Sequence, residues 1–282
     1  MKLATVAIDG RTTWGLVEGD NFLDVGAALV SRYADLRAAI AGALAGVADA
    51  KPRAAVKPLA KLTFLPVIPN PDKILCVGLN YETHRKETGR TEVEHPTIFS
   101  RYANSQTGHL KPIVRPRVST DLDFEGELAV IIGKAGRYIS RSEAMGHVAG
   151  YACYNDGSIR DFQRHTHQFT PGKNFPDTGA FGPWMMTPDE LGELAELKLT
   201  TRLNGEVVQE AQIKHMIFDI PRQIEYCSTF TRLEPGDVIV SGTPGGVGAR
   251  RNPPLWMKPG DIVEVEVERL GVLRNPVEDE AR

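Results

Sequence analysis

The chain has 282 residues, of which 41% are hydrophobic and 24% are charged, a balance that excludes disordered, coiled-coil and collagen-like proteins. Its formal net charge of −3 offers no basic surface for nucleic acid. Glycine (27 residues) and proline (19 residues) are frequent, which favours a turn-rich fold of short strands over a helical bundle.

Residues 1–68 predict a small N-terminal α+β module. Two strand-like runs, 3–8 and 13–17, flank an Asp-Gly turn signal and indicate a hairpin. The alanine-rich stretch 24–50 has apolar residues spaced three and four apart, which is the period of an amphipathic helix. A cluster of prolines around residue 69 interrupts regular structure, so we place a domain boundary there.

Residues 69–282 predict a larger domain that is rich in strands. Short apolar runs bounded by turn residues indicate strands at 74–77, 128–132, 197–203 and 238–240. Two Pro-Gly-Asp phrases each suit a turn that starts a strand, and the valines after the second phrase alternate with glutamates. Helical periods occur mainly at 142–148 and 221–229. The predicted fold class is α+β, dominated by antiparallel or mixed strands.

Neither export nor membrane insertion is expected. The N-terminal residues alternate in hydropathy and lack the apolar core of a signal peptide. The longest apolar segment, near 38–48, is shorter than the roughly 18 residues that a membrane helix needs. Three scattered cysteines without a C-x-x-C motif indicate neither a disulfide framework nor a cysteine zinc site. We therefore expect a cytoplasmic protein.

Three carboxylates predict a metal site. Glu125 and Glu127 lie two residues apart at the start of an apolar strand, so they project from the same face. Asp156 ends a second apolar run. An exposed strand edge and a plain Asp-Gly turn are the alternative explanations. Carboxylates without cysteine or histidine ligand spacing favour a hard ion, Mg²⁺ or Mn²⁺.

His84 and Glu87 predict an acid–base pair. They are three residues apart and would be neighbours on one helical turn, where the carboxylate could orient the imidazole. The alternative is a surface turn with an incidental pair. The charged tract 88–95 that follows has little apolar character and resembles a mobile lid.

Polar residues downstream of Asp156 would suit a substrate. Arg160, Gln163 and Lys173 supply cations and an amide for a carboxylate and an oxo group. His165 and His167 are either metal ligands or, as is more usual for this pattern in a polar loop, surface residues. The glycine-rich segment 241–248 follows a strand and allows close approach of the backbone to a ligand.

Five phrases occur in one order between residue 74 and about residue 270. They are Leu-Asn-Tyr-x-x-His-x-x-Glu (79–87), Asp-Phe-Glu-Gly-Glu-Leu-Ala-Val-Ile-Ile-Gly-Lys (123–134), Gly-Tyr-x-x-x-Asn-Asp with Arg-Asp-x-Gln (150–163), Gly-Lys-x-Phe-x-Asp before Gly-Pro-Trp (172–184) and Pro-Gly-Asp-Val-Ile-x-x-Gly-Thr-Pro-x-Gly-Val-Gly (235–248). In this combination the chain resembles the fumarylacetoacetate hydrolase family.

The resemblance implies a catalytic domain built as a mixed β-roll or β-sandwich, and a homodimer. It implies a divalent ion, Mg²⁺ or Mn²⁺, held by Glu125, Glu127 and Asp156, and a His84–Glu87 pair that activates water on a lid. The substrate-holding residues that it implies are Arg160, Gln163, Lys173 and Thr243. We expect Lys173 also to act in catalysis by donating a hydrogen bond to developing charge. The family's substrates are 2-oxo acids with a second carbonyl group or an unsaturation.

One segment departs from the family pattern. Where many members carry Phe-x-Lys-Pro, this chain has Phe-Ser-Arg-Tyr at 99–102. We therefore expect Arg101 to replace a lysine of the substrate wall and to bind substrate.

The leading hypothesis is hydrolysis of a carbon–carbon bond in an acylpyruvate such as fumarylpyruvate or maleylpyruvate, in the breakdown of aromatic compounds. The products would be pyruvate and a carboxylic acid. Decarboxylation of oxaloacetate and isomerisation of 2-hydroxyhepta-2,4-diene-1,7-dioate are the alternatives, because each passes through a similar enolate. A binding protein that kept the fold without activity is a third hypothesis, which the retained carboxylates and acid–base pair disfavour.

Overall fold

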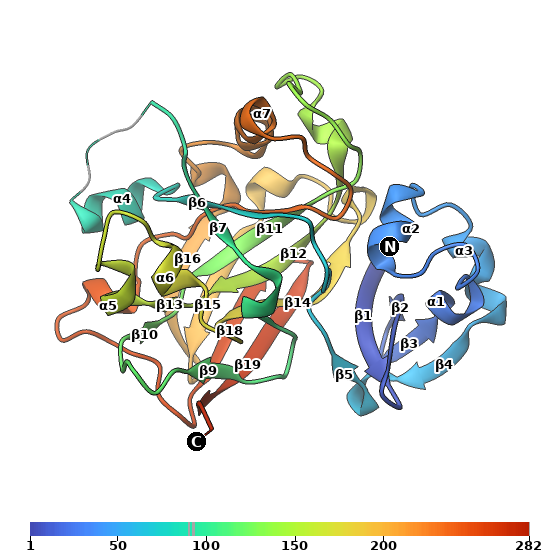
Figure 1. Ribbon diagram of the computed structural model, residues 1–282, viewed down its shortest axis with the longest axis horizontal. Helices are drawn as coiled ribbons and strands as arrows, with labels where there is room; N and C mark the ends of the chain where they lie inside the picture. The colour runs from blue at the N-terminus through green and yellow to red at the C-terminus, as the bar shows by residue number, and fades with distance from the viewer. Residues whose placement is uncertain (90, 92–93, 282) are drawn as a thin grey trace.

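In the computed structural model, which describes residues 1–89, 91 and 94–281, strands dominate and two of the sheets pack face to face (Figure 1). The larger sheet has twelve strands in the described residues; its order is β4 (Ala55–Pro58), β3 (Asn21–Asp24), β2 (Arg11–Glu18), β1 (Lys2–Ile8), β14 (Gly179–Met186), β12 (Val148–Asp156), β11 (Gly126–Ile132), β17 (Val238–Val240), β6 (Ile74–Gly78) and β7 (Thr97–Arg101), with β5 (Thr63–Phe64) beside β1 and β8 (Gln106–Thr107) beside β14. The smaller sheet has five described strands, in the order β16 (Glu206–Gln212), β15 (Lys198–Leu203), β18 (Ile262–Val267), β19 (Gly271–Asp279) and β9 (Ile113–Arg115). A ribbon of β10 (Leu122–Asp123) and β13 (Ser158–Ile159) lies beside them.

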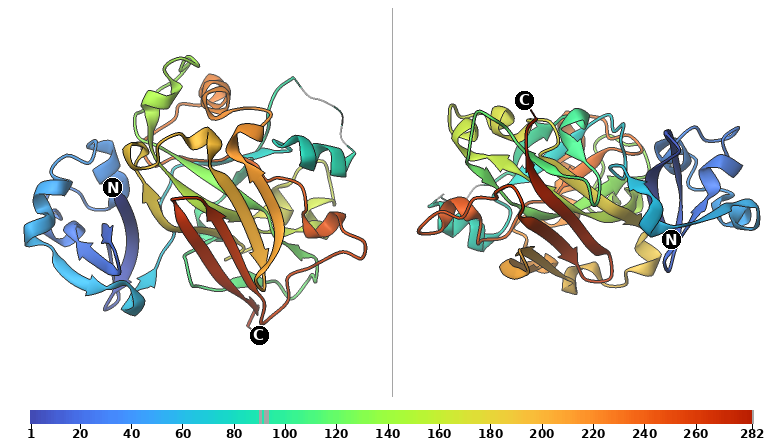
Figure 2. Two further views of the ribbon diagram at one scale, coloured as in Figure 1. Left: turned by 180° about the vertical axis from the view of Figure 1, so that it is seen from behind. Right: turned by 90° about the horizontal axis from the view of Figure 1, so that it is seen from below.

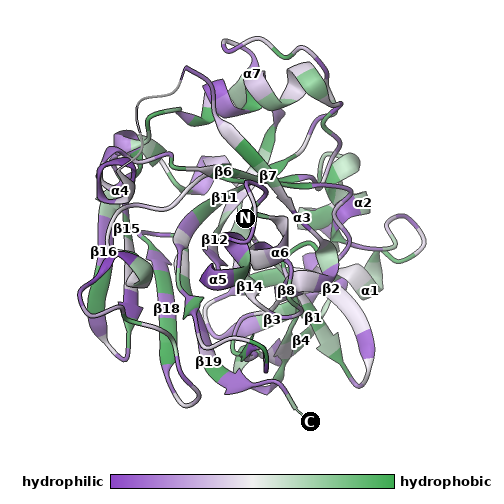
Figure 3. Ribbon diagram, turned by 60° about the vertical axis from the view of Figure 1, so that its left-hand side comes forward, coloured by the Kyte–Doolittle hydropathy of each residue, from purple (hydrophilic) through white to green (hydrophobic). Residues whose placement is uncertain are grey.

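The main core lies between the two sheets. All residues of β11 are buried, and it pairs antiparallel with β12 and β17 in the middle of the larger sheet. Facing it, Val263, Val265 and Val267 of β18 are buried, whereas the glutamates between them are partly exposed. The predicted alternation is therefore confirmed, and the strands of this sheet change between apolar and polar along their length in Figure 3. The smaller sheet faces the viewer in the left panel of Figure 2.

Helices are short and lie outside the sheets. They are α1 (Val25–Ala28), α2 (Leu36–Ala41), α3 (Val47–Ala50), α4 (Glu82–Thr88), α5 (Arg160–Gln163), α6 (Thr170–Lys173) and α7 (Ile220–Phe230). Single turns of 3₁₀ helix occur at η1 (Lys51–Arg53), η2 (Leu59–Lys61), η3 (Ala103–Ser105), η4 (Ala144–His147), η5 (Pro188–Glu190), η6 (Leu194–Glu196), η7 (Ile213–His215) and η8 (Gly248–Arg250). The predicted helix at 221–229 is α7, whereas 142–148 forms only η4. Within the described chain, none of the helices is both long and apolar enough to cross a membrane.

The N-terminal module contains the predicted hairpin of β1 and β2. The alanine-rich stretch, whose spacing indicates an amphipathic helix, is helical in three separate segments, α1, α2 and α3. Ala43 and Leu44 both have φ 54°, and Gly46 has φ 78°, so the backbone turns between α2 and α3. The apolar period still marks the buried side, since Leu36 and Ile40 are buried in the core.

The sheet continues from the N-terminal module into the rest of the chain. Strand β1 pairs antiparallel with β14, with Lys2 opposite Met186 and Leu3 opposite Met185. Leu3 also shares a core with Ala129 and Ile131 of β11. The division into two domains, 1–68 and 69–282, stays a prediction. The two parts share one sheet.

His109 lies where this module meets the smaller sheet. Its Nδ1 accepts a hydrogen bond from the Arg274 amide at 3.1 Å, and its ring packs edge-on against Phe64 at 5.0 Å. Burial, with the nearby Arg274 charge, lowers the pKa of His109 to about 4. The folded chain therefore holds this imidazole neutral.

This lowered pKa makes stability depend on pH. As the pH is lowered, the histidine of the unfolded chain takes up a proton near pH 6.5, whereas the folded one does so only near pH 4. The contribution of the neutral imidazole to the free energy of unfolding is therefore complete above about pH 6.5 and is lost as the pH falls towards 4. From pH 7.5 to pH 5, the free energy of unfolding of the wild type, measured with urea, should fall by about 2 kcal/mol more than that of His109→Gln. Equal losses in the two proteins would contradict this assignment.

Candidate active site

A cavity of about 570 Å³ opens between α4, α5, α6 and the start of β11. Most of the site residues predicted from the sequence line it: His84, Glu125, Glu127, Arg160, Gln163, Lys173 and Thr243. Asp156 is fully buried beneath these residues, and Glu87 lies behind His84. The volume falls in the range of small-molecule sites, about 300 to 1,000 Å³.

The three predicted metal ligands come together at the centre of the larger sheet. Strand β11 pairs with β12 so that Gly126 is opposite Asn155, which places Glu125 and Glu127 beside Asp156. One carboxylate oxygen from each acid lies within 4.8 Å of the others, and all three side chains are buried. The strand pairing thus makes a cluster of oxygen donors of the kind that Mg²⁺ and Mn²⁺ prefer.

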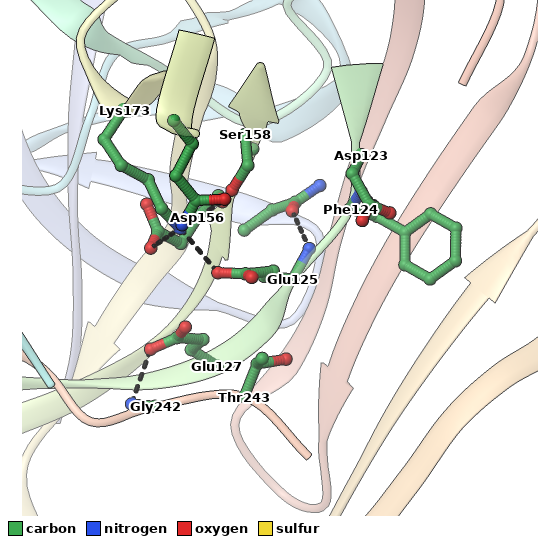
Figure 4. Close-up of polar contacts among 12 residues, drawn as sticks. Asp123, Phe124, Glu125, Glu127, Asp156, Ser158, Lys173, Gly242 and Thr243 are labelled. Atoms are coloured by element: carbon green, nitrogen blue, oxygen red, sulfur yellow. Dashed lines mark hydrogen bonds and ion pairs between the residues drawn. The ribbon is translucent and has the colours of Figure 1, made fainter. Parts of the chain in front are cut away.

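Cationic side chains neutralise part of this cluster. Lys173 Nζ donates to Glu125 Oε2 at 2.6 Å and to Asp156 Oδ2 at 2.5 Å, and it lies between these acids in Figure 4. Arg160 Nη2 donates to Glu125 Oε1 at 2.6 Å. Burial opposes ionisation of Glu125, but the charges of Arg160 and Lys173 outweigh it and lower its pKa.

Glu127 has no cationic side chain paired with it among the described residues. Its Oε2 accepts from the Gly242 amide at 2.5 Å, the contact drawn in Figure 4. Burial raises its pKa well above the ordinary value, and the negative charges of Asp156 and Glu125 raise it further. A buried acid with this surplus of negative charge fits a divalent cation, so the residues present suit the predicted metal.

Gly126 allows this cluster to sit close to the second sheet. A Cβ atom at this position would lie 1.9 Å from Thr201 Oγ1 of β15, which is shorter than any real contact. Only glycine therefore fits between the two glutamates, and larger residues would push β11 away from β15.

The acid–base pair is formed on α4. His84 Nδ1 donates to Glu87 Oε1 at 2.6 Å, and Glu87 Oε2 accepts from the Gly246 amide at 2.9 Å. This hydrogen bond assigns the proton to Nδ1, so Nε2 is the basic nitrogen, and it has no hydrogen-bond partner in the described chain. The predicted lid 88–95 contains residues 90, 92 and 93, which lie outside the described residues, so it stays a prediction.

Arg101 is not where the sequence predicted it. Its side chain is fully buried and does not line the cavity. Nη1 donates to Asp156 Oδ1 at 2.6 Å, and Nη2 donates to Thr178 Oγ1 at 2.8 Å. The prediction of a substrate contact is corrected: β7 points this guanidinium under the carboxylate cluster, where it positions Asp156.

Sequence reasoning missed two positioning residues. Asp123 accepts from Arg160 Nε at 2.7 Å and from the Gly248 and Ala249 amides at 2.8 and 3.0 Å. Gln209 of β16 donates to Thr243 Oγ1 at 2.8 Å and accepts from the Gly126 amide at 2.9 Å. Asp123 belongs to a phrase that the sequence analysis had singled out, whereas no sequence signal marks Gln209.

The histidines of the polar loop lie at the cavity mouth. His165 and His167 line the cavity and are exposed, and neither belongs to the carboxylate cluster. Of the two explanations from the sequence, the position favours surface residues. Their contact with the cavity comes from the loop between α5 and α6.

Comparison with known proteins agrees with this geometry. The family model of the fumarylacetoacetate (FAA) hydrolase C-terminal domain matches residues 73–278. The chain belongs to the fumarylacetoacetate hydrolase family. The family prediction is therefore confirmed, and the relatives and structural neighbours of this chain include tautomerases, hydrolases and isomerases.

Curated relatives include oxaloacetate tautomerases. Human mitochondrial FAHD2A is 43% identical over 224 residues, which cover 79% of this chain and 71% of that protein. The names of these relatives place them in mitochondria, so the cytoplasmic location of this chain stays a prediction.

Solved structures of the family share the fold. A putative HpcE protein from Mycobacterium smegmatis has 33% identity and a TM-score of 0.88, with both chains fully covered. Maleylpyruvate hydrolase from Sphingobium sp. SYK-6, in complex with manganese(II) and pyruvate, has 27% identity and a TM-score of 0.83 over the full length of both chains. The predicted α+β fold is confirmed, and this manganese-containing neighbour together with the carboxylate cluster supports a divalent metal.

Metal binding should stabilise the chain. At Mg²⁺ or Mn²⁺ concentrations about 100 times the Kd, the unfolding temperature should rise by about 5 to 10 °C. Glu127→Gln should abolish this rise without lowering the metal-free unfolding temperature, because burial and two like charges already disfavour an ionised carboxylate at this position. Differential scanning fluorimetry measures both quantities.

The control variant is Glu206→Gln, which removes an exposed carboxylate from β16. It should keep the full metal-dependent rise. An undiminished rise in Glu127→Gln would contradict the assignment of Glu127 as a ligand.

Proposed function

We propose that the chain is a divalent-metal-dependent hydrolase that cleaves a carbon–carbon bond in an acylpyruvate, giving pyruvate and a carboxylic acid. The observation that carries this proposal is the His84–Glu87 hydrogen bond at 2.6 Å, made in the same cavity as the carboxylate cluster. A base with a fixed orientation next to a metal site is what activation of water requires.

Metal binding and proton transfer are assigned to different residues of the cavity. Glu125, Glu127 and Asp156 would hold the ion, which when bound supplies positive charge that stabilises an enolate. His84 Nε2 takes a proton from water, and the resulting hydroxide attacks the acyl carbonyl carbon. Glu87 holds the imidazolium by its Nδ1–H.

Cleavage then completes the balance of atoms. The bond between the acyl carbon and the methylene carbon of the pyruvate part breaks, and its electron pair forms the pyruvate enolate. The proton held by His84 returns to the methylene carbon and gives the methyl group of pyruvate. Arg160, Gln163 and Lys173 line the cavity and carry the cations and amide that suit the substrate's carboxylate and oxo groups.

A second reaction is supported by the relatives. Oxaloacetate tautomerases among the relatives are 39% to 43% identical to this chain over most of its length. Such a reaction would use the same base, because His84 would move a proton between the carbon and the oxygen of an enol. Hydrolysis differs in that it consumes a water molecule and releases pyruvate.

The proposal extends to the setting of the enzyme. We place the enzyme in the breakdown of aromatic compounds, and a structural neighbour is named a hydrolase of maleylpyruvate, which is an acylpyruvate. A cytoplasmic homodimer without nucleic-acid or membrane partners completes the proposal.

Loss of the base should remove hydrolysis. His84→Ala should lower kcat for pyruvate release from fumarylpyruvate or maleylpyruvate by about 10² to 10⁴, because a general base contributes this much. Glu87→Gln should lower kcat less, since the imidazole stays in place but loses its anionic partner. The measurement is a coupled lactate dehydrogenase assay with Mg²⁺ or Mn²⁺.

The control is His215→Ala, which removes an exposed histidine that does not line the cavity. It should keep wild-type kcat. Unchanged hydrolysis in His84→Ala would refute the proposed role of the base.

A substrate panel separates the two reactions. Wild-type protein is given acylpyruvates and the enol form of oxaloacetate side by side, with ketonisation followed by absorbance and carbon dioxide release by gas analysis. We expect pyruvate release from an acylpyruvate. Ketonisation of oxaloacetate without acylpyruvate cleavage would replace hydrolysis by the tautomerase reaction, and carbon dioxide release would replace it by decarboxylation.

A further inference from the structure

Two arginines of the cavity carry charge that the protein does not neutralise. Arg164 follows α5 and Arg250 ends η8, and both line the cavity. Among the described residues, neither guanidinium has a hydrogen bond or an ion pair, whereas Arg160 in the same cavity is paired with Asp123 and Glu125.

Asp123 fixes the two segments that carry these arginines. Its carboxylate accepts from Arg160 Nε at the start of α5 and from the Gly248 and Ala249 amides at the start of η8. Arg164 lies one turn after Arg160, and Arg250 directly follows Ala249. The single carboxylate therefore fixes the backbone of both segments, and the exposed side chains of Arg164 and Arg250 extend from them at the cavity.

Both guanidiniums line one cavity, where their like charges oppose each other. Burial and the charges of Arg160 and Arg250 lower the pKa of Arg164, and the nearby Asp121 and Asp123 only partly oppose this effect. An anion placed between the guanidiniums would relieve the repulsion. Planar guanidiniums bind carboxylates through paired N–H donors.

We infer that Arg164 and Arg250 form a second anion site, which binds a carboxylate at the far end of the substrate. The carboxylate cluster and its cations take the 2-oxo acid end, so the preferred substrates are 2-oxo acids with a second carboxylate. This inference rests on the proposed function only for the choice of a 2-oxo acid as ligand, and it assigns the two arginines to substrate specificity.

The test compares two ligands that differ only at the far end. 2-Oxoglutarate and 2-oxopentanoate have the same 2-oxo acid group and five carbons, and the first ends in a carboxylate where the second ends in a methyl group. With Mg²⁺ present, calorimetry should give the wild type a Kd for 2-oxoglutarate about 10-fold lower than for 2-oxopentanoate. Arg164→Gln with Arg250→Gln should abolish this preference and leave the Kd for 2-oxopentanoate unchanged.

Arg137→Gln is the matched control, because it removes an exposed arginine that stacks on Tyr138 and does not line the cavity. It should keep the preference. Equal binding of both acids by the wild type, or a preference that survives in the double variant, would overturn the inference alone. Binding of neither acid would overturn the inference together with the proposed function.

Discussion

Three carboxylates in a buried sheet are the constraint on which the rest of the site depends. Like charges placed a few ångströms apart in a low-dielectric interior repel strongly. Lys173 and Arg160 balance Glu125, and Arg101 with Lys173 balances Asp156, but Glu127 keeps only the Gly242 amide among the described partners. The fold therefore balances two of the three acids with cations and leaves Glu127 without one.

The same contacts connect the metal cluster to the base. The segment 242–246 places its first amide on Glu127 and its last amide on Glu87, so one short stretch of backbone touches a predicted ligand and the partner of His84. Gln209 fixes this segment from the smaller sheet through Thr243 and Pro244. Both sheets thus contribute to the relative position of the metal cluster and the acid–base pair.

Local patterns in the sequence predicted the elements, and long-range pairing decided the rest. The alternation at 262–267 and the apolar run of β11 depend on neighbours in the chain, so the strands could be predicted. The Glu125–Glu127 spacing and the i, i+3 pair of His84 and Glu87 are local in the same sense. Arg101 could not be placed, because its direction depends on β7 packing beneath Asp156, 55 residues later in the chain. The division of the stretch 24–50 into three helices could not be predicted for a related reason: apolar spacing indicates the buried side, but not where the backbone turns.

The pairing of β1 with β14 has a consequence for the integrity of the molecule. At Met185 and Met186 the outer side of β14 is covered only by β1 among the described strands. A chain that lost its first residues would present unpaired backbone amides and carbonyls there, next to the apolar surface that Leu3 and Trp14 now cover. Such an edge is a template for another strand. By covering it, the N-terminal module prevents self-association through the sheet on which the carboxylate cluster is built.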